Sequence, residues 1–67
     1  MNWDIIEGRW TEMKGKAREQ WGKLTDDDLE VIAGRREKLS GTLQRVYGKT
    51  REEVEREMDE WAVRHNR

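Results

Sequence analysis

The side chains that most often carry covalent or metal chemistry are scarce in this chain. Its one histidine is His65, its one serine is Ser40, and cysteine is absent. A serine nucleophile needs an adjacent base, and a structural zinc site needs about four Cys or His ligands. Neither set can be assembled here. We therefore predict no catalytic, cofactor-binding or metal site, and no enzymatic activity.

Carboxylates are abundant, and three of them are consecutive in the run Asp26-Asp27-Asp28. A calcium loop needs acidic residues at alternate positions, with a glycine and a closing glutamate, and this run lacks that spacing. Thr25 with Asp28 three residues later is instead typical of a capping box at a helix start, where the helix dipole also favours acidic side chains. The run therefore indicates the first turn of a helix.

Basic side chains gather in residues 34–51, which carry six bases and one acid, whereas residues 24–33 and 52–67 are acidic. We favour the interpretation that this basic segment faces the two acidic segments and neutralises them inside the domain, because the sequence pI is only about 5.8. The alternative is nonspecific contact with nucleic acid phosphates. The candidate phosphate contacts are Arg35, Arg36, Lys38, Arg45 and Lys49.

The elements that position these residues are predicted to be helices. Proline is absent, and apolar residues recur every three or four positions, as one face of a helix requires. No stretch alternates with the period of two that a strand would show. We expect an all-α bundle of four, or alternatively five, short helices near residues 3–20, 26–33, 35–47 and 51–64. In a further alternative, the second and third run as one bent helix through Gly34.

Two similar helix ends indicate an internal repeat at an offset of 26 residues. Trp21-Gly22-Lys23 and Tyr47-Gly48-Lys49 both place a glycine after the last apolar residue, where a left-handed conformation can close a helix. Each is followed by a threonine that begins a capping box, Thr25 or Thr50. The offset therefore predicts two similar helical hairpins packed on one another.

Glycines also repeat every seven residues, at 8, 15 and 22 and again at 34, 41 and 48. Gly15 and Gly41 are expected on the helix face opposite the apolar residues, at a cost of up to about 1 kcal/mol each relative to alanine. Three explanations are open: the glycines let another helix of the same fold approach, they keep the helices loosely formed, or they let a flat partner come close.

Length and composition limit the size of the core. A chain of 67 residues with 33% hydrophobic and 43% charged residues supports one domain, residues 1–67, with a thin core. The four tryptophans are expected to supply much of that core. The longest apolar run, Val31-Ile32-Ala33, is far below the ~20 residues of a membrane helix. We expect a cytoplasmic protein without a membrane partner.

Several of these motifs resemble the CsbD-like family of small bacterial stress proteins, and the resemblance covers nearly the whole chain. Its most distinctive part is the run W-G-K-L-T-D-D-D at residues 21–28; the other matching residues are Trp10, Gly15-Lys16, Glu19, Gly34, Leu39, Gly41, Gln44 and Tyr47-Gly48. The resemblance implies a bacterial cytoplasmic protein of the general stress response with no assigned activity. It also implies two helical hairpins packed roughly orthogonally, as in SAM-domain-like proteins, and it supplies no catalytic residues.

The function expected from these features is that of a non-enzymatic protective or binding module. The many glycines and the mean hydropathy of −1.25 resemble the hydrophilins, proteins thought to protect other macromolecules during water loss. Other macromolecules under stress are accordingly the expected partners, and weak nucleic-acid binding by the basic segment is the alternative. We expect a monomer or a weak dimer.

Overall fold

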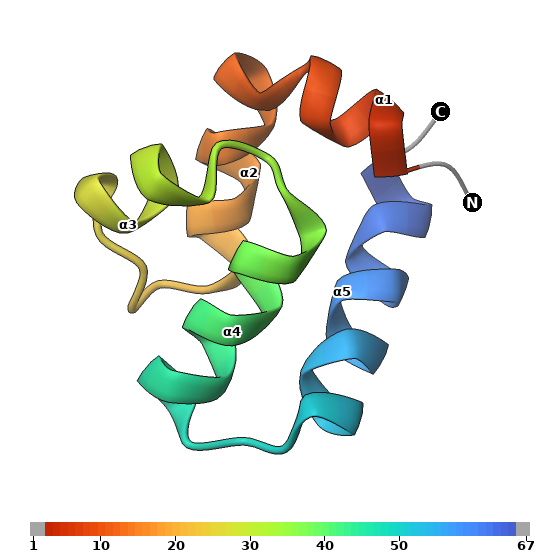
Figure 1. Cartoon of the computed structure of the whole chain (residues 1–67). Helices are drawn as coiled ribbons and strands as arrows, with labels where there is room; N and C mark the ends of the chain where they lie inside the picture. Colours follow the sequence, from red (N-terminus) through yellow and green to blue (C-terminus); the bar gives the residue numbers. More distant parts are fainter. Residues whose placement is uncertain (1–2, 66–67) are drawn as a thin grey trace.

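The computed structural model describes residues 3–65, which form five helices and no strand (Figure 1). The helices are α1 (Trp3–Gly8), α2 (Trp10–Gln20), α3 (Asp26–Ile32), α4 (Arg36–Tyr47) and α5 (Arg51–His65). The expected all-α bundle is therefore confirmed, with the larger of the two helix numbers. The orthogonal, SAM-domain-like packing of two hairpins stays a prediction.

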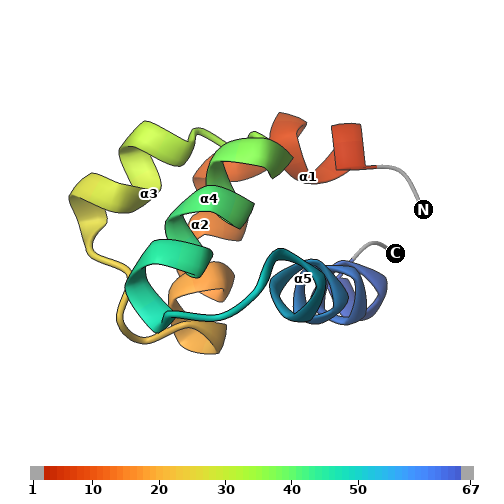
Figure 2. The same cartoon turned by 60° about the horizontal axis from the view of Figure 1, so that its bottom comes forward.

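The helices are arranged around α4. Helices α4 and α5 run in opposite directions beside each other, and α3 packs against the other side of α4 (Figures 1 and 2). Helix α1 precedes α2 and reaches the C-terminal end of α5, where the Trp3 and Trp61 ring centroids lie 6.0 Å apart. The first and last helices of the chain are therefore neighbours.

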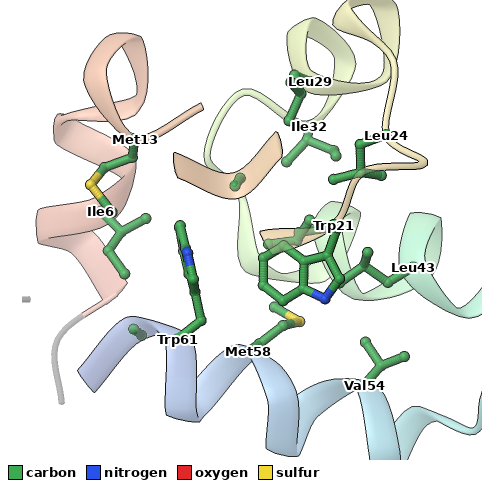
Figure 3. Packing of buried hydrophobic residues seen from close by; sticks show 13 residues of the cluster. Ile6, Met13, Trp21, Leu24, Leu29, Ile32, Leu43, Val54, Met58 and Trp61 are labelled. Atoms are coloured by element: carbon green, nitrogen blue, oxygen red, sulfur yellow. The ribbon is translucent and has the colours of Figure 1, made fainter. Parts of the chain in front are cut away.

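The core is a single cluster of thirteen buried hydrophobic side chains from all five helices and the segment after α2 (Figure 3). Trp61 lies at its centre, fully buried, and also contacts Trp21 at 5.3 Å between ring centroids. Trp3, Trp10 and Tyr47 pack against the cluster from its edge. The expectation that tryptophan supplies much of this small core is confirmed.

The two predicted capping boxes are present. The Thr25 hydroxyl accepts from the Asp28 N–H at 3.1 Å, and the Asp28 carboxylate accepts from the Thr25 N–H at 3.1 Å. Thr50 and Glu53 make the same reciprocal pair at the start of α5, at 3.1 and 3.2 Å. Each box satisfies N–H groups that have no partner inside the helix. Asp28 is thus occupied in capping.

The helix expected over residues 3–20 is broken at Arg9, which separates α1 from α2. The indole N–H of Trp3 donates to the Gly34 carbonyl at 2.7 Å, and that of Trp10 donates to the Leu29 carbonyl at 2.9 Å. We attribute the bend to these two anchors together with the contact of Trp3 on Trp61. The apolar spacing continues through Arg9, so it gave no sign of the break.

The turn between α3 and α4 makes them separate helices, and it requires glycine. Ala33 and Gly34 are both left-handed, with φ of 50° and 80°. A Cβ on Gly34 would lie 2.8 Å from the Glu7 Cα, closer than any side chain can come. The alternative of one bent helix through Gly34 is therefore wrong.

The two glycines predicted to close helices, Gly22 and Gly48, differ in conformation. Gly48 is left-handed, with φ of 65°, and closes α4 as predicted. Gly22 has no positive φ, because α2 ends one residue earlier and the chain leaves it through Trp21 at φ −124°, ψ 85°. That extended conformation accompanies the burial of Trp21, which is 3% exposed. The left-handed conformation expected at Gly22 is absent.

Most glycines have no packing role, contrary to the first of the three explanations. A Cβ placed on Gly8, Gly15, Gly22 or Gly41 would meet nothing within 4 Å. Gly34 alone among the described glycines is pressed against another helix. The glycines at the middle of α2 and α4 therefore leave bare backbone on the outside of the molecule.

Candidate functional site

Half of the basic segment is neutralised by α5. Arg36 lies 2.9 Å from the Asp59 carboxylate and 3.5 Å from that of Glu55. Lys49 lies 2.6 Å from the Glu57 carboxylate, and Arg51 pairs with Glu55. The favoured interpretation is thus confirmed for the acidic segment 52–67. Two of the five candidate phosphate contacts, Arg36 and Lys49, are already engaged.

The other three candidates, Arg35, Lys38 and Arg45, are exposed and have no ion pair among residues 3–65. Lys38 and Arg45 are seven residues apart, so they lie on one side of α4, and Arg35 precedes its first turn. The structure therefore brings three free cations to the outer side of this helix.

Helix α3 packs against α4, but the ion pairs of the acidic segment 24–33 are with α2, which corrects the expectation that the basic segment would neutralise it. Arg18 lies 2.7 Å from the Asp26 carboxylate, and Lys14 lies 3.2 Å from that of Glu30. Asp26 and Glu30 are engaged in these pairs and Asp28 in its cap, so no carboxylate of α3 forms an ion pair with Lys38 or Arg45.

A shallow, open depression runs between α3 and α4 beside two of these cations. Val31, which is 66% exposed, lies in it next to Lys38 and Arg45. Asp28 and Gly41 also line it. The hollow therefore combines two cations, the carboxylate of Asp28, one exposed apolar side chain and the backbone at Gly41.

Sequence reasoning missed a junction between the two similar helix ends. The Lys23 N–H donates to the Tyr47 hydroxyl at 3.1 Å, and the ammonium groups of Lys23 and Lys49 lie 5.3 and 5.7 Å from the centre of the Tyr47 ring. The Trp21 indole donates to Glu57 at 3.1 Å. The matching W-G-K and Y-G-K motifs were the available signal. Their contacts hold the fold together.

The perturbed pKa values belong to these structural contacts. Hydrogen bonds from Lys49 and then Trp21 lower the pKa of the Glu57 carboxyl. The Thr50 N–H and hydroxyl lower the pKa of Glu53, and Arg51 lowers that of Glu55. Each shift favours the charged form in a cap or an ion pair on the surface.

The side chains that could act as nucleophiles, bases or metal ligands do not lie together. The His65 ring packs against the Trp61 ring in a tilted arrangement with 5.4 Å between ring centroids, and the Ser40 hydroxyl accepts from the Gln44 amide at 3.1 Å. Within residues 3–65 no three His, Asp or Glu side chains come together as metal ligands. Over the same range, no helix combines the length and the apolar character needed to cross a membrane.

These features define a class of protein: a small helical bundle whose motif residues are caps, helix ends and core contacts. The chain belongs to the CsbD-like family, whose model matches residues 4–56. It is 48% identical to the UPF0337 protein YjbJ of Escherichia coli O6:H1 over 66 residues, 98% of this chain and 96% of that protein. It is 52% identical to the UPF0337 protein ECA0631 of Pectobacterium atrosepticum over 65 residues, 97% and 94% of the two chains.

Proposed function

We propose that this protein is a non-enzymatic stress-response protein that protects other macromolecules through weak contacts of its hydrated, charged surface. The observation that carries the proposal is the division between a closed apolar core and an outside of mixed charge. Thirteen hydrophobic side chains are buried together, and among residues 3–65 the large hydrophobic side chains left exposed are Ile5, Val31 and Val63. Such a surface favours water and weak polar contacts over a tight apolar interface.

Membership of the CsbD-like family supports the stress-response part of the proposal. The bare glycines of α2 and α4 support the contact part, because a partner can reach the helix backbone there. Unlike a disordered hydrophilin, this protein would act as a folded domain with a fixed charge arrangement.

Drying tests the proposal. A labile enzyme is dried and rehydrated with this protein, with an equal mass of albumin, or with buffer alone, and its recovered activity is measured. We expect more recovery with this protein than with albumin. Equal or lower recovery would count against protection.

A variant that unfolds shows whether the folded surface matters. Trp61→Ala removes the central core side chain, which is fully buried, and leaves the charged residues unchanged. We expect its protection to drop to the albumin level. Full protection by the unfolded variant would show that composition, rather than the folded surface, is responsible.

Nucleic-acid binding is a second candidate function, favoured by one observation: Arg35, Lys38 and Arg45 are free on one side of α4 while the other bases of their segment are paired. Three phosphate contacts predict that log K falls with log salt concentration at a slope of roughly −3. Affinity for duplex DNA would be measured across a salt series by fluorescence anisotropy.

The matched variants for that experiment are Lys38→Ala with Arg45→Ala, and Arg9→Ala with Arg56→Ala, which removes the same charge at exposed positions outside α4. We expect the variant on α4 to bind DNA more weakly with a smaller salt slope, and the control variant to bind as the unaltered protein does. No affinity at low salt would end this candidate.

A further inference from the structure

Two helix faces of this molecule match in spacing and oppose each other in charge. The first, the α2 face, is Glu12, Gly15 and Glu19; the second, the α4 face, is Lys38, Gly41 and Arg45. They are related by the offset of 26 residues, under which α2 (10–20) becomes 36–46, within one residue of α4. In both, the charges stand three residues before and four after the glycine.

The four charged side chains are exposed, and none has an ion pair within residues 3–65. Of the other charged side chains of the basic segment and of α3, five form ion pairs inside the molecule and Asp28 caps α3, whereas Arg35, Glu37 and Asp27 have no ion pair within residues 3–65; the five are Arg36, Lys49, Arg51, Asp26 and Glu30. The chain thus keeps two carboxylates on one helix and two cations on another available for an outside partner.

The order of the charges selects one orientation. Viewed along the axis of α2, Glu12 and Glu19 are rotated by about 40–60° from Gly15 in the same direction. Viewed along the axis of α4, Lys38 and Arg45 are rotated by about 40–60° from Gly41, also in that direction. When the two helices pack antiparallel with Gly15 opposite Gly41, the side of α2 that carries Glu12 and Glu19 lies against the side of α4 that carries Lys38 and Arg45. The residues of the two helices then run past each other in opposite order along the axis. Glu12 then faces Arg45, and Glu19 faces Lys38, each pair within about 1.5 Å of the same height.

The other side of each glycine also matches in this orientation. It carries Arg18 on α2, which already pairs with Asp26 of its own copy, and Glu37 on α4, and these two side chains would face each other. In a parallel pair the sides would be exchanged, and Glu12 and Glu19 would face Glu37 and Gln44 instead. Only the antiparallel arrangement joins opposite charges on both sides.

At Gly15 and Gly41 no side chain keeps the two helix backbones apart. A Cβ on Gly15 or Gly41 would meet nothing within 4 Å, so the two helix backbones can approach at these positions more closely than side chains usually allow. A formal net charge of −1 adds little general repulsion between copies.

We propose that the α2 face of one copy docks antiparallel on the α4 face of a second copy, with Gly15 opposite Gly41. The contact joins two different surfaces of the chain, which leaves one face free on each copy, so it can extend into open chains unless its rotation closes a ring. Helix α3 lies between the depressions beside Gly15 and Gly41, so the two faces are separate.

This association is weak and depends on salt. Two helices of 11 and 12 residues bury less area than a standard protein interface, and exposed ion pairs are screened by salt. It therefore forms at high protein concentration, the condition that water loss produces. The inference does not rest on the protective function proposed above.

Sedimentation velocity on the full chain tests the proposal, from about 10 µM to about 1 mM, the range in which a small interface associates. At about 20 mM salt the weight-average sedimentation coefficient should rise with concentration, and at about 500 mM salt the rise should be lost. A coefficient that stays at the monomer value throughout the range would overturn the proposal.

Charge reversal identifies the surfaces. Lys38→Glu with Arg45→Glu makes both faces acidic, and Glu12→Lys with Glu19→Lys makes both basic. Each double variant alone should associate at least about tenfold more weakly, and a mixture of the two should associate again because an acidic face then meets a basic one. Folding of each is checked by circular dichroism, and these exposed positions make no core contact.

Arg9→Glu with Arg56→Glu is the matched control, because it changes net charge as Lys38→Glu with Arg45→Glu does, at exposed positions outside both faces. It should associate like the unaltered protein. Unchanged association of either double variant, equal loss in this control, or no recovery on mixing would each contradict the docking arrangement.

Discussion

The bare glycines of α2 and α4 allow a prediction with a definite sign: Gly15→Ala and Gly41→Ala should each stabilise the protein. Both glycines lie inside helices, and the added Cβ would meet nothing within 4 Å. The gain comes from the lower backbone entropy of alanine in the unfolded chain and its higher helix propensity.

The expected size is up to about 1 kcal/mol of unfolding free energy for each substitution. For a domain of this size, 1 kcal/mol corresponds to a shift of about 4–8 °C in Tm. The two positions lie on different helices and share no contact, so the double variant should show the sum of the two effects. Urea unfolding followed by tryptophan fluorescence measures the free energy, and thermal circular dichroism measures the Tm.

Gly48→Ala is the matched control. Its surroundings are equally open, but its φ of +65° is a left-handed conformation that alanine adopts at a cost of roughly 1–2 kcal/mol. We expect the same substitution to destabilise at Gly48 and to stabilise at Gly15 and Gly41. Destabilisation at Gly15 or Gly41 would refute the reasoning, because it would show a packing role that the structure does not have.

Three further substitutions test the cap, the surface ion pairs and the core. Thr25→Ala removes the side-chain acceptor at the start of α3 and should cost about 1 kcal/mol in urea unfolding; no change would mean that the cap is not needed. The pKa of Glu57 is lowered from its usual 4.5, so its charged form stabilises the fold above that pH, and the contribution is lost as the pH falls through the lowered pKa. Glu57→Gln should therefore reduce the loss of unfolding free energy that the protein shows as the pH falls below the usual pKa of a glutamate. An unchanged pH dependence would contradict the stabilising role of the Glu57 carboxylate. Trp61→Ala empties the centre of the core and should cost about 3–5 kcal/mol, enough to unfold much of a domain this small at room temperature, as near-ultraviolet circular dichroism would report.

Local sequence signals predicted the helices and their caps well. The Thr25 and Thr50 boxes depend on residues three apart, so the sequence alone contains all that is needed to form them. The left-handed Gly48 follows the same logic. The basic segment was also partly predicted, since charge balance alone indicated that α5 would neutralise part of it.

Features that depend on distant parts of the chain were not predictable in this way. The bend at Arg9 accompanies indole hydrogen bonds to Leu29 and Gly34, which lie 19 and 31 residues from their donors. Gly22 and Gly48 follow equivalent motifs, yet only one is left-handed, because Trp21 is drawn into the core while Tyr47 stays at its edge. The pairing of α3 with α2, which leaves Lys38 and Arg45 free, likewise required the assembled fold.

The position of Trp61 has a consequence for how the molecule comes apart. Its ring contacts Trp3 from the first helix and Trp21 from the segment after the second, and it is itself part of the last helix. Removing a segment from either end of the chain would therefore open the same central cluster. No part of the chain should therefore remain folded without the rest, so the protein should unfold in a single cooperative transition. A protease should accordingly degrade each molecule completely or leave it intact.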